Sequence, residues 1–234
     1  MGRRFGGSRG GGGATSDHEL AVEARVTRND SEDLGLFEDL DDLEALVGSQ
    51  RSNTNQTNDE ATFQVDYTRP IGTTRLETGL KLTAERVAND LFYERLIDGT
   101  FVEDVGQTNA FEYDRQIGAA YVQAARPIGP VQVQAGLRME AASRSFDLLT
   151  EVPALPGIPE VSDTDASQSY ADLFPSVFVT LPLGTPGAGT LVKASYRRSI
   201  NRPRTFFLNP FPSFEDTTFI RVGNPQLTPE YTNK

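Results

Sequence analysis

The sequence predicts an all-β fold, built as an antiparallel up-and-down meander. Three observations lead to this prediction: apolar and polar residues alternate along several runs, short turns join three pairs of runs, and long polar stretches separate the pairs. Alternation with a period of two places apolar side chains on one face of a strand and polar side chains on the other. Short connections on one rim and long connections on the other are typical of a transmembrane β-barrel. We therefore predict about seven strands that form an incomplete segment of such a barrel.

The clearest predicted hairpin joins residues 62–68 to residues 75–85 through a turn at residues 69–73. The apolar face of the second run consists of Leu76, Thr78, Leu80, Leu82 and Ala84. The opposite face carries Arg75, Glu77, Lys81 and Glu85. We expect the apolar face to meet lipid and the charged face to form a solvated, cross-paired wall of the lumen. Contact of this wall with a plug domain or a passing substrate is the alternative.

Two more hairpins and one single run complete the predicted set. The second hairpin pairs residues 116–126 with 131–140, so that Arg138 and Glu140 join the charged wall. The third pairs residues 173–183 with 191–198, and residues 20–27 form an earlier strand. In a barrel the apolar face should end in aromatic residues at the membrane interfaces. Candidates for these positions are Tyr67, Tyr121, Tyr196, Phe206 and Phe207.

Composition excludes several other classes of protein. No run of about 18 apolar residues occurs, which excludes a transmembrane helix, whereas a barrel strand needs only about 9 to 11 residues. The sequence has no cysteine, and His18 is its only histidine, so disulfide, zinc and thiol chemistry have little support. No catalytic constellation is evident, and we predict neither an enzyme nor a cofactor. The net charge of −11 argues against a nucleic-acid partner.

The first 17 residues differ from the rest of the chain. Residues 1–17 are rich in glycine and arginine, and we interpret them as a flexible segment rather than an RNA-binding tail. They lack the apolar core of a secretory signal peptide. Because an outer-membrane protein must be exported, either the export signal lies upstream or the membrane prediction is wrong.

Residues 29–60, 87–109 and 144–169 are expected to form long loops on one rim, the extracellular one. The first includes an acidic cluster between Glu32 and Glu44, which we interpret as solvated because it lacks the spacing of a calcium loop. A short amphipathic helical turn is plausible there. Its apolar positions are Leu36, Leu40, Leu43 and Val47.

A strand count of seven cannot describe a finished barrel. An open sheet edge in lipid leaves backbone groups without partners, and single-chain bacterial barrels have even strand numbers. We therefore predict that residues 18–234 are a partial outer-membrane β-barrel, truncated before closure. Further strands are expected after Lys234 and before Met1.

The C-terminal third contains the most specific motif. A strand ending in Tyr196 and two arginines is followed by an Arg-Pro, an Asn-Pro and a "GNPxLxPEYT" segment. The signature residues are Arg202, Pro203, Asn209, Pro210, Gly223, Asn224, Pro225, Leu227, Pro229, Glu230 and Tyr231. This pattern resembles the barrel of TonB-dependent outer-membrane receptors, especially the outer membrane protein beta-barrel family. The resemblance covers roughly residues 62–234.

The resemblance implies a receptor in the outer membrane of a Gram-negative cell that takes up a nutrient ligand. Its implied partners are outer-membrane lipid, a plug domain, the remaining barrel strands, and TonB through the plug; the ligand stays unknown. We interpret the signature as a stiff connector into a strand that begins at Glu230 and Tyr231, with Tyr231 suited to the interface, and a ligand role is the alternative. For the whole chain the alternative is a soluble β-sandwich or surface adhesion module that binds a glycan or protein through its long loops.

Overall fold

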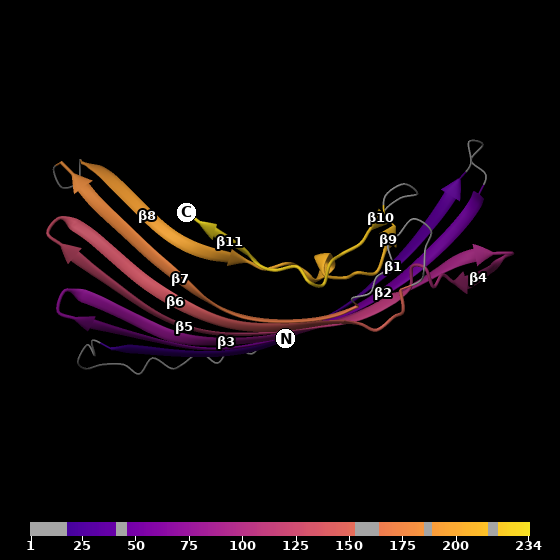
Figure 1. Ribbon diagram of the computed structural model, residues 1–234, viewed down its shortest axis with the longest axis horizontal. Helices are drawn as coiled ribbons and strands as arrows, with labels where there is room; N and C mark the ends of the chain where they lie inside the picture. The colour runs from indigo at the N-terminus through magenta and orange to yellow at the C-terminus, as the bar shows by residue number, and fades with distance from the viewer. Residues whose placement is uncertain (1–17, 41–45, 153–163, 185–188, 215–219) are drawn as a thin grey trace, which may run out of the picture.

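The computed structural model describes residues 18–40, 46–152, 164–184, 189–214 and 220–234. Strands form almost all of this part of the chain (Figure 1). They are β1 (Glu19–Leu40), β2 (Leu46–Ile71), β3 (Thr74–Ile97), β4 (Thr100–Glu103), β5 (Asn109–Ile128), β6 (Val131–Leu148), β7 (Asp165–Leu183), β8 (Thr190–Asn201), β9 (Ser213–Phe214), β10 (Ile220–Arg221) and β11 (Glu230–Asn233). The prediction for residues 1–17 lies outside the described residues, as do the proline-rich stretch 153–159 and part of the acidic cluster.

Neighbouring strands of the main sheet are antiparallel, in the order β1-β2-β3-β5-β6-β7-β8-β11, with β4 paired to β3. This order confirms the meander. Within the described residues the sheet has nine strands rather than seven and is not closed, since β1 and β11 lie at its two ends. The added strands are β4 and β11. Glu230 begins β11, as the sequence predicted.

The short turns lie where the sequence placed them. Ile71 pairs with Thr74 across the β2–β3 turn, and Ile128 pairs with Val131 across the β5–β6 turn. Gly72 and Gly129 each have a φ of 59°, a left-handed conformation that glycine adopts without a steric penalty. These turns define one rim of the sheet, called here the short-turn rim. The opposite edge is called the long-loop rim.

The predicted long loops are largely wrong, because the strands continue through them. β1 and β2 pair over almost their whole lengths, so most of residues 29–60 is a ladder. The predicted helical turn is also wrong: Leu36 and Leu40 lie in β1 and Val47 lies in β2. Similarly, β3 continues to Ile97, β6 continues to Leu148 and β7 begins at Asp165. In β3 the extension lacks the regular alternation that identifies a half-buried strand, and at the end of β6 the apolar residues Phe146 and Leu148 lie on the concave face rather than the convex one.

The sheet is curved, and the chain between β8 and β11 lies over its concave side (Figure 1). Strand register assigns each residue to one of two faces, because cross-strand partners share a face. One row of partners across six strands is Val22, Val65, Leu80, Ala120, Met139 and Leu173. Leu80 is 58% exposed and Leu173 is 50% exposed. These apolar residues therefore lie on the convex face, where the described part of the chain does not cover them. A soluble β-sandwich, the alternative fold, would cover this face with a second sheet.

A row of charges limits this apolar band toward the long-loop rim. On the convex face, Val26, Ala61 and Ala84 are followed two residues further along their strands by Arg28, Asp59 and Arg86. The exposed ion pairs are Arg28–Asp59 at 3.8 Å and Arg86–Glu112 at 2.8 Å. Beyond this row the convex face of β2 is polar, with Thr57, Asn55 and Asn53. Because β1 and β2 contain 22 and 26 residues, they are much longer than the roughly 9 to 11 residues that cross a bilayer.

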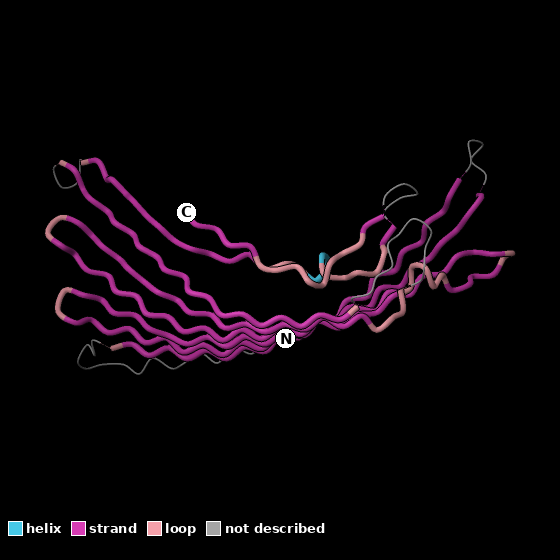
Figure 2. The backbone as a smooth tube through the Cα atoms, viewed as in Figure 1, coloured by secondary structure: helices cyan, strands magenta, loops and turns pink. Residues whose placement is uncertain are grey.

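Helical structure is limited to one short turn in the described residues, η1 (Thr205–Phe207), which lies between β8 and β11 (Figure 2). The described chain contains no helix that is both long and apolar enough to cross a membrane.

Candidate functional site

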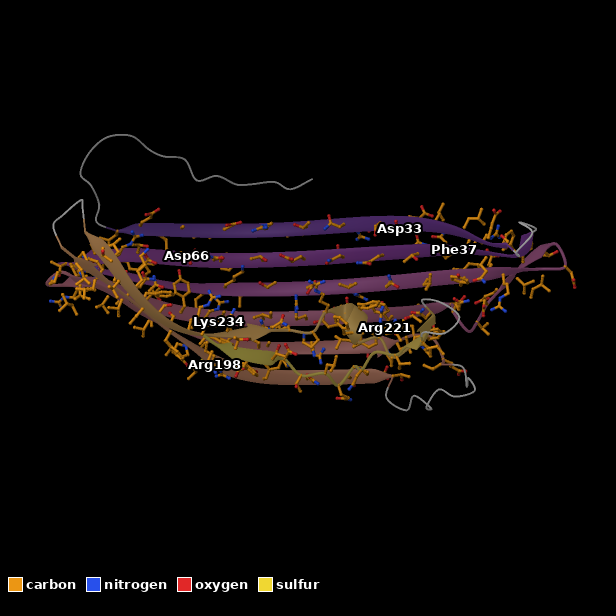
Figure 3. All side chains as sticks on the ribbon, turned by 90° about the horizontal axis from the view of Figure 1, so that it is seen from above. Asp33, Phe37, Asp66, Arg198, Arg221 and Lys234 are labelled. Carbon is orange, nitrogen blue, oxygen red and sulfur yellow. The ribbon has the colours of Figure 1, made fainter. Side chains whose placement is uncertain are left out.

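Residues 202–229, called here the infolded connection, join β8 to β11, and their described parts, 202–214 and 220–229, cover part of the concave face. In the view from above, the labelled Arg221 lies over the sheet (Figure 3). Leu208 of the connection is fully buried and Phe211 is nearly so. They pack against a concave-face cluster of Val87, Phe111, Tyr113, Phe146 and Leu148 from β3, β5 and β6. The main apolar core of the described chain is therefore inside the curve of the sheet.

Asn209 attaches this part of the connection to the sheet. Its Nδ2 donates to Oδ1 of Asn109 on β5 at 3.1 Å, and its Oδ1 accepts the Phe211 amide at 2.9 Å. The neighbouring Pro210 and Pro212 are among the most deeply buried side chains. Proline has no amide hydrogen, so its burial leaves no backbone donor without a partner. The Asn-Pro of the signature thus forms a docking point of the connection.

Gly223 lies where the two arms of the connection meet. Its amide donates to the Asn209 carbonyl at 2.9 Å, and the Asn224 amide donates to the Phe207 carbonyl at 2.8 Å. A Cβ at position 223 would lie 2.3 Å from the Asn209 carbonyl oxygen and 2.8 Å from that of Phe207. Glycine is needed here because the two backbones approach closely.

A tight turn follows at residues 224–227. The Leu227 amide donates to the Asn224 carbonyl at 3.2 Å, and the Gln226 amide donates to Oδ1 of Asn224 at 2.8 Å. Asparagine in the first position and proline in the second are favoured in such turns. Pro225 is buried, whereas Leu227 is partly exposed.

Two side chains of the sheet hold this turn. Arg144 on β6 is buried and donates through Nη2 to the carbonyls of Pro225, at 3.2 Å, and of Leu227. Gln168 on β7 donates to the Gln226 carbonyl at 2.9 Å. Sequence reasoning missed both residues, because it assigned residues 144–169 to a loop. If the alternation of β6 had been continued for four more residues, it would have placed Arg144 on the same face as Glu140.

Arg202 and Pro203 begin the connection beside a network of charges. Arg202 donates to Glu140 Oε2 at 2.6 Å and to the Tyr170 hydroxyl at 2.8 Å, while Arg138 donates to Glu140 Oε1 at 2.6 Å. Glu140 is 8% exposed, and a carboxylate buried to this extent needs such partners. The pairing of Arg138 with Glu140 matches the predicted lumenal wall. Two more ion pairs involve that wall: Arg75–Glu77 within β3 at 2.8 Å, and Arg115–Glu85 between β5 and β3 at 2.5 Å.

Tyr231 pairs with Ile200, which lies on the same face of β8 as Tyr196, and its place at the membrane interface stays a prediction. The Tyr231 hydroxyl donates to Asp172 Oδ2 at 2.5 Å, and the Arg198 guanidinium lies 4.5 Å from the Tyr231 ring centroid. Arg198 also donates to Asp172 at 3.3 Å. These contacts cross the gap between β7 and the end of β8, since the β7–β8 ladder stops at the Ser176–Arg197 pair. Pro229 precedes β11, and Glu230 accepts from Asn201 at 3.5 Å.

The other proposed interface aromatics divide between the faces. Tyr67 and Tyr196 lie on the convex face near the short-turn rim, in agreement with the prediction. Tyr121 lies on the concave face and donates to Asp66 at 2.7 Å, and Phe206 and Phe207 lie in the infolded connection. The sequence could not separate these groups, because aromatic type does not identify a face.

A pocket of about 240 Å³ lies between the infolded connection and strands β2, β3 and β5. The sheet contributes Gln56, Asn89, Leu91, Asn109 and Phe111, and the connection contributes Phe206, Asn209 and Arg221 among others. The Arg221 guanidinium lies 4.5 Å from the centroid of the Phe206 ring. Gln56 and Asn89 are cross-strand partners on the rim side of the Asp59–Arg86 row. The pocket therefore opens in the half of the sheet nearer the long-loop rim.

Comparisons with known proteins agree with this arrangement. No curated protein matches the sequence. The crystal structure of the ferric citrate transporter FecA in the unliganded form matches with a TM-score of 0.54 at 14% identity. The match covers 85% of this chain and 26% of that chain, so this chain spans about a quarter of the length of that transporter. The outer membrane protein beta-barrel family matches residues 14–234. The chain belongs to the outer membrane protein beta-barrel family, and its place is the outer membrane.

Proposed function

We propose that this chain forms part of the barrel of a TonB-dependent receptor that takes up a nutrient ligand across the outer membrane. The main support for this proposal is the infolded connection, which lies on the concave side of the sheet and forms a pocket with β2, β3 and β5. The likeness in fold to a ferric citrate transporter supports the same proposal. A barrel that served only as a scaffold would not require a pocket on its inner face.

The orientation follows from the two rims. In outer-membrane barrels the short turns face the periplasm and the long connections face outward. A ligand arriving from outside would then meet the polar strand extensions and the pocket before it reached the membrane. A plug domain and further barrel strands, outside residues 18–234, complete the proposed receptor, and the plug would contact TonB.

Uptake tests this proposal. The gene is deleted in its host, TonB is depleted in a parallel strain, and spent defined medium is analysed by mass spectrometry. We expect the full-length protein in the outer-membrane fraction and at least one nutrient that both strains fail to remove. A full-length protein found in the soluble fraction, or the absence of any nutrient that depends on both genes, would contradict the proposal.

A glycine pair links this uptake to the infolded connection. Gly223→Ala places a Cβ against the Asn209 carbonyl and should lower uptake strongly, because the connection cannot dock. Gly118→Ala is the matched control, since its Cβ would first meet Leu82 Cδ2 at an ordinary 3.6 Å. If both variants are present in equal amounts in the outer membrane and take up the nutrient equally well, docking of the infolded connection is not required for transport.

A further inference from the structure

We propose that the pocket beneath the infolded connection binds a neutral oligosaccharide. This inference rests on the proposed function and adds the chemical class of the ligand. It follows from the kinds of side chain that line the pocket and from the polar surface that leads to it.

The polar lining consists mainly of amides and hydroxyls. Gln56, Asn89, Asn109 and Asn209 present amide groups, and Thr205 and Ser213 present hydroxyls. Each of these groups can donate and accept hydrogen bonds. Asn109 and Asn209 already bond each other, so Gln56, Asn89, Thr205 and Ser213 are the groups offered to a ligand. Sugar hydroxyls have the same dual character as these groups. Among the described residues that line the pocket, Arg221 is the one charged side chain, although the sequence has a net charge of −11.

The pocket also offers aromatic surface. Phe206 is 50% exposed, and Phe111 and Phe211 close the floor against the sheet. An exposed aromatic ring next to orienting polar groups is the usual composition of a small-molecule site. The C–H face of a sugar ring can pack on Phe206 while its hydroxyls reach the amides. Arg221 already lies over that ring, which leaves its charge partly engaged.

An uncharged polar track leads from the long-loop rim to this pocket. Its concave-face side chains on β2 are Gln50, Ser52, Thr54, Gln56 and Asn58. Asn58 Oδ1 is buried without a hydrogen-bond partner. An extended chain of neutral hydroxylated units fits such a track better than a compact charged ligand does.

The test uses the full-length protein, purified in detergent, and titration calorimetry. The probes are maltohexaose, cellohexaose and xylohexaose as neutral sugars, and hexagalacturonate as an anionic one. We expect at least one neutral hexasaccharide to bind. Gln56→Ala and Asn89→Ala should each weaken that binding about tenfold, because each removes a hydrogen-bonding partner at the ligand. Asn55→Ala is the matched control, since Asn55 adjoins Gln56 in β2 but lies on the opposite face.

Three outcomes would overturn the inference: no neutral probe binds, only hexagalacturonate binds, or the pocket variants weaken binding no more than Asn55→Ala does. Heat-modifiable migration on gels shows that each variant has folded. TonB-dependent uptake of some other nutrient would leave the proposed function intact, so the two failures can be distinguished.

Discussion

The convex band and the infolded cluster contain the same kinds of residue in opposite surroundings. On the convex face, Leu80 and Leu82 are more than half exposed, although both are large and apolar. On the concave face, Leu208 has no exposure and Phe146 has 1%. The difference shows that, within the described ranges, the chain covers its own apolar side chains on the concave face and not on the convex face. The surrounding medium must cover the other face, and in the outer membrane that medium is lipid.

The charged residues show a similar division. On the convex face Arg28 and Asp59 form an exposed pair at the edge of the apolar band. On the concave face Glu140 is buried between Arg138 and Arg202. Exposed pairs contribute little to stability, whereas loss of one partner from a buried network leaves an unpaired charge. Loss of one partner of Glu140 should therefore cost more stability than loss of the Arg28–Asp59 pair.

The largest expected effect separates the two apolar environments. Leu208→Ala should cost about 3–5 kcal/mol, because it removes a buried side chain and leaves a cavity. Leu82→Ala should cost only about 2 kcal/mol, since lipid chains fill the space that the side chain leaves. Urea unfolding of the full-length protein in lipid vesicles measures both. Equal costs would break the distinction between a packed core and a lipid-facing surface.

Charge placed on each face sharpens the same comparison. Leu80→Lys should destabilise the barrel by about 2–4 kcal/mol, because it places an ammonium group in the middle of the lipid-facing band. Gln123→Lys should be tolerated, since Gln123 lies on the concave face next to Glu77. Heat-modifiable gel migration after outer-membrane extraction reports the folded fraction. A folded Leu80→Lys protein in normal amount would argue against lipid on the convex face.

Arg144 tests how firmly the sheet holds the connection. Arg144→Met removes the donors to the Pro225 and Leu227 carbonyls and should cost about 1–3 kcal/mol. Faster hydrogen exchange at the Gly223 and Asn224 amides, with the sheet amides unchanged, is the expected result. The control Arg86→Met removes an exposed ion pair and should leave those amides protected. Unchanged exchange in Arg144→Met would mean that apolar packing alone holds the connection.

The smallest effect concerns the long-loop rim. Burial alone would raise the pKa of Asp104, but hydrogen bonds from Gln107 and the Gly106 amide, with the charge of Arg95, lower it overall. A lowered pKa stabilises the folded state above the unfolded pKa of about 3.9, and this stabilisation is lost as the pH falls through the folded value. Asp104→Asn should therefore abolish a small acid-dependent loosening of the β3–β4 hairpin. Hydrogen exchange at pH 3 and pH 6 would detect it, and an unchanged dependence would assign the loosening to another group.

The sequence predicted the strands that cross the membrane but not their full lengths. Apolar and polar residues alternate along residues 75–85 because one face of the strand meets lipid and the other does not. This alternation can be recognised in the sequence. Beyond Arg86 the convex face of β3 carries Ala88 and Asp90 while the concave face carries the buried Val87, so the apolar–polar contrast of residues 75–85 ends although the hydrogen-bonded ladder continues to Ile97. Backbone pairing with neighbouring strands, which no local pattern reports, extends the sheet.

The candidate site was predictable in its position along the chain and not in its contacts. Proline restrictions indicated a stiff segment before Glu230, and the structure has β11 there. The partners of that segment are distant: Arg144 is 81 residues from Pro225, and Asn109 is 100 residues from Asn209. Only the register of the whole sheet brings these residues together. The infolded path of the connection was consequently beyond sequence reasoning.

The central claim, that the convex face meets lipid and the concave face meets the lumen, is tested most directly on β3. The measurement is how often spin labels along this strand collide with oxygen and with a nickel chelate. The sequence has no cysteine, so single cysteines at position 78 and at positions 80 to 85 can each receive a spin label without competing sites in this chain. Position 79 is left out, because a Cβ at Gly79 would lie 2.7 Å from the Val65 carbonyl oxygen. In lipid vesicles, we expect labels at the convex positions 78, 80, 82 and 84 to collide mainly with oxygen, which concentrates in lipid. Labels at the concave positions 81, 83 and 85 should collide mainly with a water-soluble nickel chelate or be protected from both. Loss of this alternation, or its inversion, would contradict a lipid-facing convex surface and a concave face turned to the lumen.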